Sequence, residues 1–202
     1  RLQGDWSSDV CSSDLDADPK VRARANERGL AREVCETSSD AVNGADLVIF
    51  CVPVGKIAEA AADIAGSLGD DTIVSDVGSS KQSVARDLAA ALSGQTIIPA
   101  HPVAGTEQSG PDAGFASLFE NRWCILTPPE SADEAAVTAL SEFWESLGAK
   151  IEIMDAEHHD LVLAVTSHIP HLIAYTIVGT ASDLEDVTRR DRKSTRLNSS
   201  HL

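Results

Sequence analysis

The sequence predicts an α/β fold, a doubly wound and mostly parallel sheet, followed by the start of an all-helical domain. Over residues 46–154, short apolar runs rich in β-branched residues alternate with helical segments and are joined by short connections. Such runs are typical of parallel strands covered on both faces. After Asp155 the strand pattern stops and only helical patterns follow. These two observations place the boundary between the predicted domains near residue 154.

Glycine and proline residues delimit the predicted elements. Gly29, Gly69 and Gly94 stop helices, Pro53 ends a strand, and Ser131 is expected to cap a helix. In chain order, the predicted elements are a helix over 21–28, a strand over 46–52, a helix over 56–68, a strand over 72–75, a helix over 81–92, strands over 96–100 and 122–127, a helix over 131–147 and a strand over 150–154. Helices over 156–167 and 172–183 follow, and Pro170 is expected to separate them.

Both ends of the chain look foreign to this pattern. Residues 191–201 are one translation of a DNA string that resembles a sequencing-library adapter, and residues 5–15 translate its opposite strand in another frame. We therefore expect 1–15 and 191–202 to be adapter-derived, and we exclude them from fold reasoning as tags are excluded. Residues 16–154 are then expected to form a sheet domain that lacks its first strand, and residues 155–190 the start of a helical domain.

Composition excludes some classes of partner. The 202 residues carry 16 basic and 32 acidic side chains, a formal net charge of −16. Nucleic acids and anionic membranes both require clustered Lys and Arg, so neither is expected as a partner.

The spacing of Cys35, Cys51 and Cys124 does not suggest a metal site, and Cys51 and Cys124 are expected in the core of a protein from the reducing cytoplasm. No apolar run is judged long enough to span a membrane.

Two short stretches carry the chemistry. Residues 76–81 (DVGSSK) and 101–107 (HPVAGTE) each follow a predicted strand directly. Because the carboxyl ends of neighbouring parallel strands meet at one crevice, the hydroxyl of Ser79 and the imidazole of His101 are expected to converge there. That pairing indicates proton transfer on a small molecule beside a cofactor. Two plainer interpretations stay open: Ser79 could cap the following helix, and His101 could be an ordinary turn residue.

A nucleotide-binding sheet normally opens with a glycine-rich turn, yet no G-x-G-x-x-G occurs in the chain. The expected truncation accounts for its absence. Asp16 precedes a helix at the place where the second strand of such a sheet ends, and a carboxylate there bonds the adenosine ribose of NAD. This position favours NAD over NADP, although Lys20 and Arg22 lie near enough to weaken the preference. Alternatively, Asp16 is a helix-capping acid.

Four segments together resemble the prephenate/arogenate dehydrogenase family, over roughly residues 16–190. They are ADLVIFCVPVG (45–55), DVGSSK (76–81), HPVAGTEQSG (101–110) and SHIPH (167–171), in this order and at these spacings. The resemblance implies a Rossmann-like fold. It also implies the family's activity in tyrosine biosynthesis, which is oxidation of prephenate or arogenate with NAD(P) and release of carbon dioxide, giving 4-hydroxyphenylpyruvate or tyrosine.

The resemblance also implies roles for individual residues. His101 would be the base that removes the substrate's hydroxyl proton, and Ser79 would hydrogen-bond and orient that hydroxyl. The substrate side would further include Thr106, Glu107 and His171. The cofactor side would include Val52, Pro53, Val54 and Gly78, in addition to Asp16.

The same resemblance implies what the chain lacks. Beyond Arg190 the family supplies an arginine for the substrate carboxylate and most of the helices that form a homodimer. The fragment itself is therefore expected to be inactive. The missing first strand would lie beside the strand over 47–52, and its loss would leave an open edge that favours aggregation.

Parts of the sequence are compatible with two other functions and with a metal site. A dehydrogenase of the β-hydroxyacid type would carry a catalytic lysine on a following helix, whereas Lys150 precedes a strand and residues 156–183 contain no lysine. A non-catalytic dinucleotide-binding module is the second rival. His159, His168 and His171 could suggest zinc, but Pro170 interrupts them and no cysteine completes the ligand set, so no metal is expected. His159 and Asp160 are instead expected at a solvated helix start.

Overall fold

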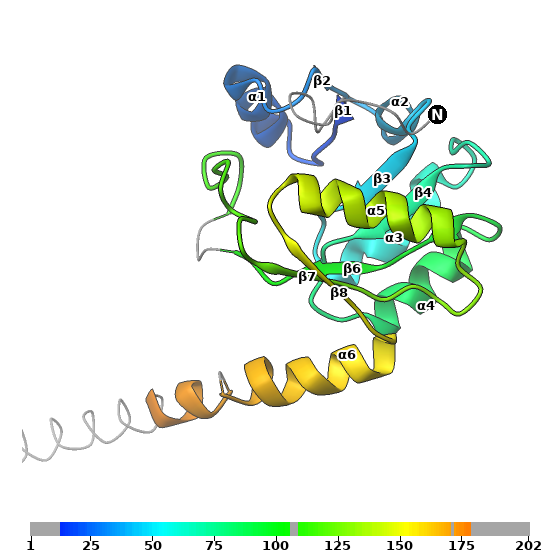
Figure 1. Ribbon diagram of the computed structural model, residues 1–202. Helices are drawn as coiled ribbons and strands as arrows, with labels where there is room; N and C mark the ends of the chain where they lie inside the picture. The colour runs from blue at the N-terminus through cyan, green and yellow to red at the C-terminus, as the bar shows by residue number, and fades with distance from the viewer. Residues whose placement is uncertain (1–12, 106–108, 171, 179–202) are drawn as a thin grey trace, which may run out of the picture. The chain divides into compact units, whose positions relative to one another are not determined.

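The computed structural model describes residues 13–105, 109–170 and 172–178 (Figure 1). The chain divides into two compact units, residues 1–160 and residues 161–202. The first unit holds the strands described below, together with Ser79, His101 and His159.

The first unit contains three small sheets. β1 (Ser13–Asp14) pairs in parallel with β2 (Glu33–Val34), and β3 (Leu47–Phe50), β4 (Ile73–Asp76) and β5 (Thr96–Ile97) form a parallel three-stranded sheet. In the third sheet, β7 (Trp123–Leu126) lies antiparallel to β6 (Ala100–Pro102) and parallel to β8 (Lys150–Ile153). Within the described residues, β3 is an edge strand of its sheet.

The strand predicted over 96–100 is in fact two strands with different partners. The N–H of Ile98 still bonds the carbonyl of Val74 at 2.9 Å, but Pro99 has no N–H to continue the ladder beside β4. The carbonyl of Pro99 instead accepts from the N–H of Thr127 at 2.9 Å. The chain thus passes from one sheet to the next at Pro99, and His101 lies inside β6 rather than after a strand.

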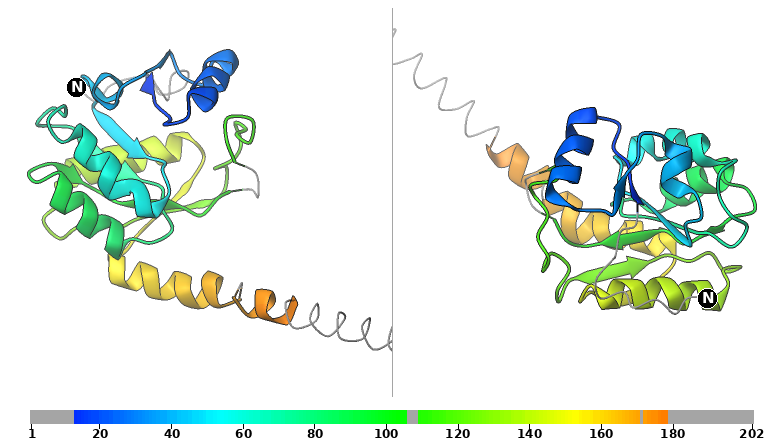
Figure 2. Two further views of the ribbon diagram at one scale, coloured as in Figure 1. Left: turned by 180° about the vertical axis from the view of Figure 1, so that it is seen from behind. Right: turned by 90° about the horizontal axis from the view of Figure 1, so that it is seen from above.

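Side chains alternate between two hydrophobic clusters along β3 and β4, which confirms strands covered on both faces. Leu47, Ile49 and Ile73 belong to the cluster around α5 (Glu134–Ser146), together with Leu140 and Trp144. The intervening side chains face the other cluster, to which α3 (Ile57–Ile64) and α4 (Gln82–Ala91) also contribute. Its members include Val48, Phe50, Val74, Ile57, Ala61, Val84 and Leu88. Figures 1 and 2 show α5 on one side of these strands and α3 and α4 on the other. The α/β class with helices on both faces, Rossmann-like, is confirmed.

Most helices begin and end close to the predicted residues. Asp18 caps α1 (Pro19–Arg28), and Gly29 ends it in the left-handed conformation with φ of 63°. Asp133, rather than the predicted Ser131, caps α5 by accepting from the N–H of Ala135 at 3.2 Å. The remaining helices of the first unit are α2 (Ser38–Val42), the 3₁₀ turn η1 (Val54–Lys56), α3 (Ile57–Ile64) and α4 (Gln82–Ala91), and α6 (Ala156–Leu163) begins there.

Two further differences from the sequence predictions have simple causes. Ser13 and Asp14, expected to lie outside the fold, form β1, and the Oγ of Ser13 donates to the carbonyl of Ala41 at 2.6 Å. A two-residue parallel pairing uses backbone atoms only, so it does not depend on which side chains stand there. Cys51 is exposed, not buried, because β3 ends at Phe50; Cys35 and Cys124 are buried.

The second unit is helical in its described residues, 161–170 and 172–178. A π-helical turn, η2 (Ala164–His168), precedes Pro170, whose missing N–H is tolerated there without the predicted break. The helix Ala156–Val178 has a mean hydropathy of 1.6 and is long and apolar enough to cross a membrane, contrary to the expectation from the sequence. Length and composition alone are weak grounds for a membrane span, because a helix that packs in a protein interface passes the same test.

Candidate active site

The turn between β4 and α4 is organised around one buried carboxylate. Asp76 ends β4 with its side chain fully buried, and its Oδ2 accepts from the N–H of Gly78 at 2.7 Å. The same oxygen accepts from the Nζ of Lys81 at 2.5 Å, and the Lys81 side chain is also fully buried. Gly78 is required here by space: a Cβ would lie 2.9 Å from both Asp76 Oδ2 and Val54 Cγ2.

This ion pair binds both the carbonyl and the N–H group of Ala100, the residue before His101. Lys81 Nζ donates to the carbonyl of Ala100 at 2.5 Å, and the N–H of Ala100 donates to Asp76 Oδ1 at 3.2 Å. The side chains therefore connect β4 to β6 at the point where Pro99 has ended the backbone ladder. His101 follows directly, so the position of its backbone is set by the pair.

Burial dominates the electrostatics of the pair. Removal from water raises the pKa of Asp76 and lowers the pKa of Lys81, although each group favours the charged form of the other. Both shifts point toward the neutral forms, which means that the desolvation of the two charges exceeds their attraction. The pair is thus an energetic cost of this architecture, even with the hydrogen bonds that Asp76 accepts from Gly78 and Ala100.

A second histidine contacts His101. The Nδ1 of half-buried His101 lies 2.9 Å from the Nε2 of His159, and the rings meet edge to face with centroids 5.1 Å apart. His159 is fully buried, so its expected place at a solvated helix start was wrong. Its Nδ1 lies 2.9 Å from Oδ1 of Asp160. No local sequence pattern predicts this row of three side chains, because the two histidines are 58 residues apart in the chain.

Asp160 also caps α4. Its Oδ1 accepts from the N–H of Lys81 at 2.7 Å and its Oδ2 from the N–H of Gln82 at 3.0 Å. These are orphan donors of the first helical turn, which a side chain within the local sequence usually satisfies. The plainer interpretation of Ser79 as the helix cap is therefore wrong: Ser79 is exposed in the turn, and no side chain at the helix's own capping position serves.

The predicted cofactor-side residues fall into two groups. Val54 and Gly78 lie in contact, beside the turn that carries Ser79, and exposed Val52 and Pro53 precede Val54 at the carboxyl end of β3. Asp16 lies apart from them, between β1 and α1, where its Oδ1 accepts from the N–H of Asp18 at 2.7 Å. It does not cap α1, because Asp18 does. The predicted substrate-side residues Thr106, Glu107 and His171 lie outside the described residues.

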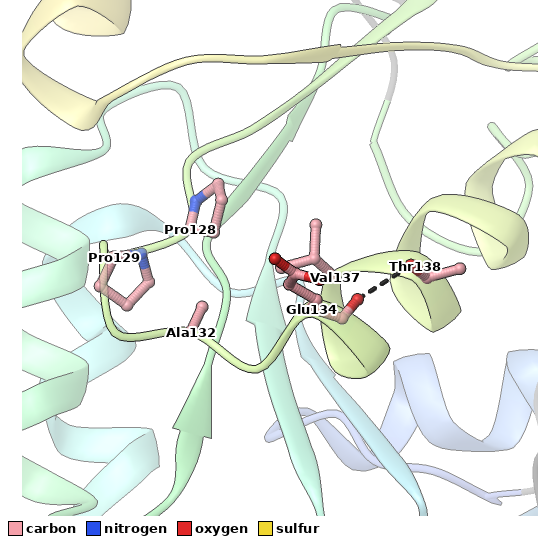
Figure 3. Close-up of a pocket in the computed structure, with 6 residues that line it drawn as sticks. All are labelled: Pro128, Pro129, Ala132, Glu134, Val137 and Thr138. Atoms are coloured by element: carbon pink, nitrogen blue, oxygen red, sulfur yellow. Dashed lines mark hydrogen bonds between the residues drawn. The ribbon is translucent and has the colours of Figure 1, made fainter.

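A separate pocket lies at the start of α5 (Figure 3). Its lining is mainly apolar, and the hydroxyl of Thr138 donates within its helix to the carbonyl of Glu134 at 2.8 Å. The residues that line it are Pro128, Pro129, Ala132, Glu134, Val137 and Thr138. None of them belongs to the network around His101, so the pocket is not part of the candidate site.

Comparison with known proteins places the chain in a family. The family model described as the nucleotide-binding domain of prephenate dehydrogenase matches residues 5–153, and the model for the dimerization domain of prephenate dehydrogenase matches residues 155–202. The chain belongs to the prephenate dehydrogenase family. The rival assignment to the β-hydroxyacid type of dehydrogenase is thereby set aside.

Relatives of known function agree with this prephenate dehydrogenase membership. A cyclohexadienyl dehydrogenase of Zymomonas mobilis is 45% identical over 184 residues, which cover 91% of this chain and 63% of that protein. A prephenate dehydrogenase of Lactococcus lactis is 34% identical, over 81% of this chain and 45% of its own length. The chain therefore spans about half to two thirds of the length of these two relatives.

Solved structures show the same fold. Prephenate dehydrogenase from Aquifex aeolicus superimposes with a TM-score of 0.77 at 32% identity, over 83% of this chain and 60% of that one. One structure of that enzyme holds hydroxyphenyl propionate and NAD⁺. The arogenate dehydrogenase of Synechocystis also gives a TM-score of 0.77, at 27% identity, over 86% of this chain and 63% of its own.

Proposed function

We propose that the protein oxidises prephenate or arogenate with NAD(P) and releases carbon dioxide, a step of tyrosine biosynthesis. Family membership supports the reaction class. The single observation in the structure that carries the proposal is the half-buried His101, held through Ala100 by a buried ion pair and through its ring by His159. A histidine fixed at both backbone and ring is suited to serve as a general base.

The chemistry assigns one task to each side chain. The substrate is a cyclohexadienol with a carboxylate on the carbon opposite its hydroxyl. His101 takes the hydroxyl proton while the carbinol carbon gives up its hydride, and Ser79 orients the hydroxyl by a hydrogen bond. The ring ketone then takes up the electron pair of the breaking bond to the carboxylate, so that carbon dioxide leaves and the ring becomes aromatic. A base with a pKa near neutrality suits this step.

The residues at the carboxyl ends of β3 and β4 fit one half of a dinucleotide. Ligands of open α/β sheets bind at the carboxyl ends of the strands, and Val54 and Gly78 follow the ends of β3 and β4. Val52, Pro53, Val54 and Gly78 would hold the nicotinamide half, and Asp16 the adenosine ribose. Bound there, NAD, or alternatively NADP, would supply the hydride acceptor. The glycine-rich turn that usually grips the phosphates does not occur among the 202 residues.

Partners and location follow from the family. Thr106, Glu107 and His171 would lie on the substrate side, and the apolar helix that begins at Ala156 would contribute to a homodimer, as the match to a dimerization domain supports. The strongly acidic chain favours neither nucleic acid nor an anionic membrane as partner. A biosynthetic enzyme of this kind would work in the cytoplasm.

The test is His101→Asn in the complete protein. We expect turnover with prephenate or arogenate to fall by about 10²–10⁴-fold, the usual contribution of a positioned general base, while NAD binding persists. Turnover is measured by the absorbance of NADH and binding by calorimetry. Near-normal turnover in the variant would remove His101 from its role. NAD binding by a wild type that oxidises neither substrate would favour the rival non-catalytic module.

A further inference from the structure

We propose that His159 and Asp160 are positioning residues that hold the His101 ring with its proton on Nδ1, so that Nε2 is the basic nitrogen. The inference deepens the proposed function and rests on it for the identity of the reaction. The proton arrangement itself is a property of the folded chain and is testable without any substrate.

Asp160 is surrounded by hydrogen-bond donors. The backbone N–H groups of Lys81 and Gln82 and the ring of His159 all point at its two oxygens. Burial alone would raise the pKa of Asp160, but these hydrogen bonds outweigh it and hold the pKa below its usual range. Asp160 is therefore a carboxylate, which only accepts hydrogen bonds, so the Nδ1 of His159 must carry a proton.

The other nitrogen of His159 lies against His101. Burial is the largest influence on this ring and lowers its pKa, with Lys81 acting in the same direction and Asp160 and Asp76 against it. His159 is accordingly neutral near pH 7, and a neutral imidazole with a proton on Nδ1 has a bare Nε2. That nitrogen can only accept, so the proton in the 2.9 Å contact belongs to the Nδ1 of His101.

The proton on Nδ1 decides which nitrogen of His101 is basic. With Nδ1 protonated, its Nε2 carries the lone pair that can remove a proton from a substrate hydroxyl. The nitrogen that a partner binds sets the tautomer of a histidine, and a carboxylate behind the partner fixes it further. When Nε2 takes up the proton, His101 becomes a cation. Its Nδ1–H bond to His159 then becomes charge-assisted and stronger, with the negative charge of Asp160 behind it.

The same contacts fix the ring in space. Asp160 is fastened to the start of α4, and Lys81, one residue before that helix, reaches the carbonyl of Ala100. The ring of His101, through His159 and Asp160, and its backbone, through Ala100 and Lys81, are thus both connected to the start of α4. The arrangement serves the task that a buried aspartate performs for the histidine of a serine protease, where it sets the tautomer and stabilises the imidazolium.

The first test is direct observation of the tautomer by long-range ¹H–¹⁵N correlation NMR of the complete protein with ¹⁵N-labelled histidines, 6 of which lie in this chain. We expect His101 to show a protonated Nδ1 and a bare Nε2 above its pKa. The variant His158→Gln, which removes the exposed neighbouring histidine, is the matched control and should leave this pattern unchanged. A protonated Nε2 on neutral His101 overturns the proposal, whatever the reaction.

The second test is kinetic, in the complete protein. His159→Leu keeps the bulk of the ring but removes both hydrogen bonds, and we expect kcat to fall on the order of 10²-fold or more with the KM for NAD little changed. The rising limb of the pH profile should move to lower pH, because the acceptor that stabilises the His101 cation is gone. His159→Gln, whose carboxamide can accept from Nδ1, should recover part of the rate. His158→Leu should change neither kcat nor the position of the pH profile.

Other outcomes separate the possibilities. If His159→Leu does not fold, the same measurements are made on Asp160→Asn. The amide oxygen of the new asparagine can still cap α4, while the negative charge is lost. Reduced thermal stability with unchanged kcat and pH profile would mean that the two residues are only structural, which overturns the proposal. A wild type with the expected tautomer and no activity on prephenate or arogenate would defeat the proposed function and leave the proton arrangement standing.

Discussion

Two ion pairs of similar length lie in regions of opposite character. Lys81 and Asp76 meet at 2.5 Å with both side chains fully buried, whereas Arg24 and Asp112 meet at 2.7 Å with 47% and 63% of their side chains exposed. A hydrogen bond from Arg24 holds the pKa of Asp112 below its usual range, while burial raises that of Asp76 despite its lysine partner. Surroundings, not separation, therefore decide what a pair does to the protein.

The largest effect is expected from breaking the buried pair. Lys81→Met leaves the Asp76 carboxylate buried without a countercharge, and it removes a donor from the carbonyl of Ala100. We expect the free energy of unfolding to fall by about 3–5 kcal/mol. Urea denaturation at low protein concentration measures it. A fall in the free energy of unfolding of less than about 1 kcal/mol would mean that the buried pair contributes no more than a surface pair, which would contradict the difference between the two pairs.

A double variant sharpens the same contrast. Asp76→Leu combined with Lys81→Met removes both charges together, so no uncompensated ion is left in the interior. Because the desolvation of the pair exceeds its attraction, the double variant should recover much of the stability lost by Lys81→Met alone. A double variant less stable than the single one would show that the hydrogen bonds of Asp76 to Gly78 and Ala100 dominate.

An intermediate effect is expected from pH, through His159. Its pKa is lowered in the folded chain by burial, so folding favours the neutral ring. The stability that it contributes is present above the unfolded pKa of about 6.5 and is lost as pH falls through the lowered folded value. Urea denaturation from pH 7.5 downward should show stability decreasing with acid, with a shallower decrease in His159→Gln. His158→Gln should retain the wild-type slope, and identical slopes in all three proteins would contradict the assignment.

The smallest effect is expected at the exposed pair. Arg24→Met removes the contact between α1 and Asp112, but water and salt already screen those charges. The midpoint of thermal unfolding should shift little, and what shift there is should vanish at high salt. A large shift that persists in 1 M salt would show that this contact anchors α1 in a way that its exposure does not suggest.

Local patterns predicted the strands and the central histidine, but not the histidine's surroundings. β3 and β4 were predictable because their β-branched runs mark buried strands without reference to a distant partner, and His101 was singled out by the motif around it. The role of Asp160 was not predictable, since it caps a helix 79 residues earlier in the chain and no local signal marks such a cap. His159 was assigned to solvent for the same reason. The division of the strand at 96–100 depended on which sheet Pro99 could join, a tertiary choice.

The contact between Gly78 and Val54 has a consequence for engineering. Both residues are candidates for the cofactor side, so libraries aimed at a new cofactor would vary them. A Cβ at position 78 would lie 2.9 Å from Val54 Cγ2, and glycine cannot become smaller to make room for a larger residue at 54. The two positions therefore share one fixed volume. Selection at position 78 alone would return only glycine, and a smaller residue at position 54 would still leave a Cβ at position 78 only 2.9 Å from Asp76 Oδ2.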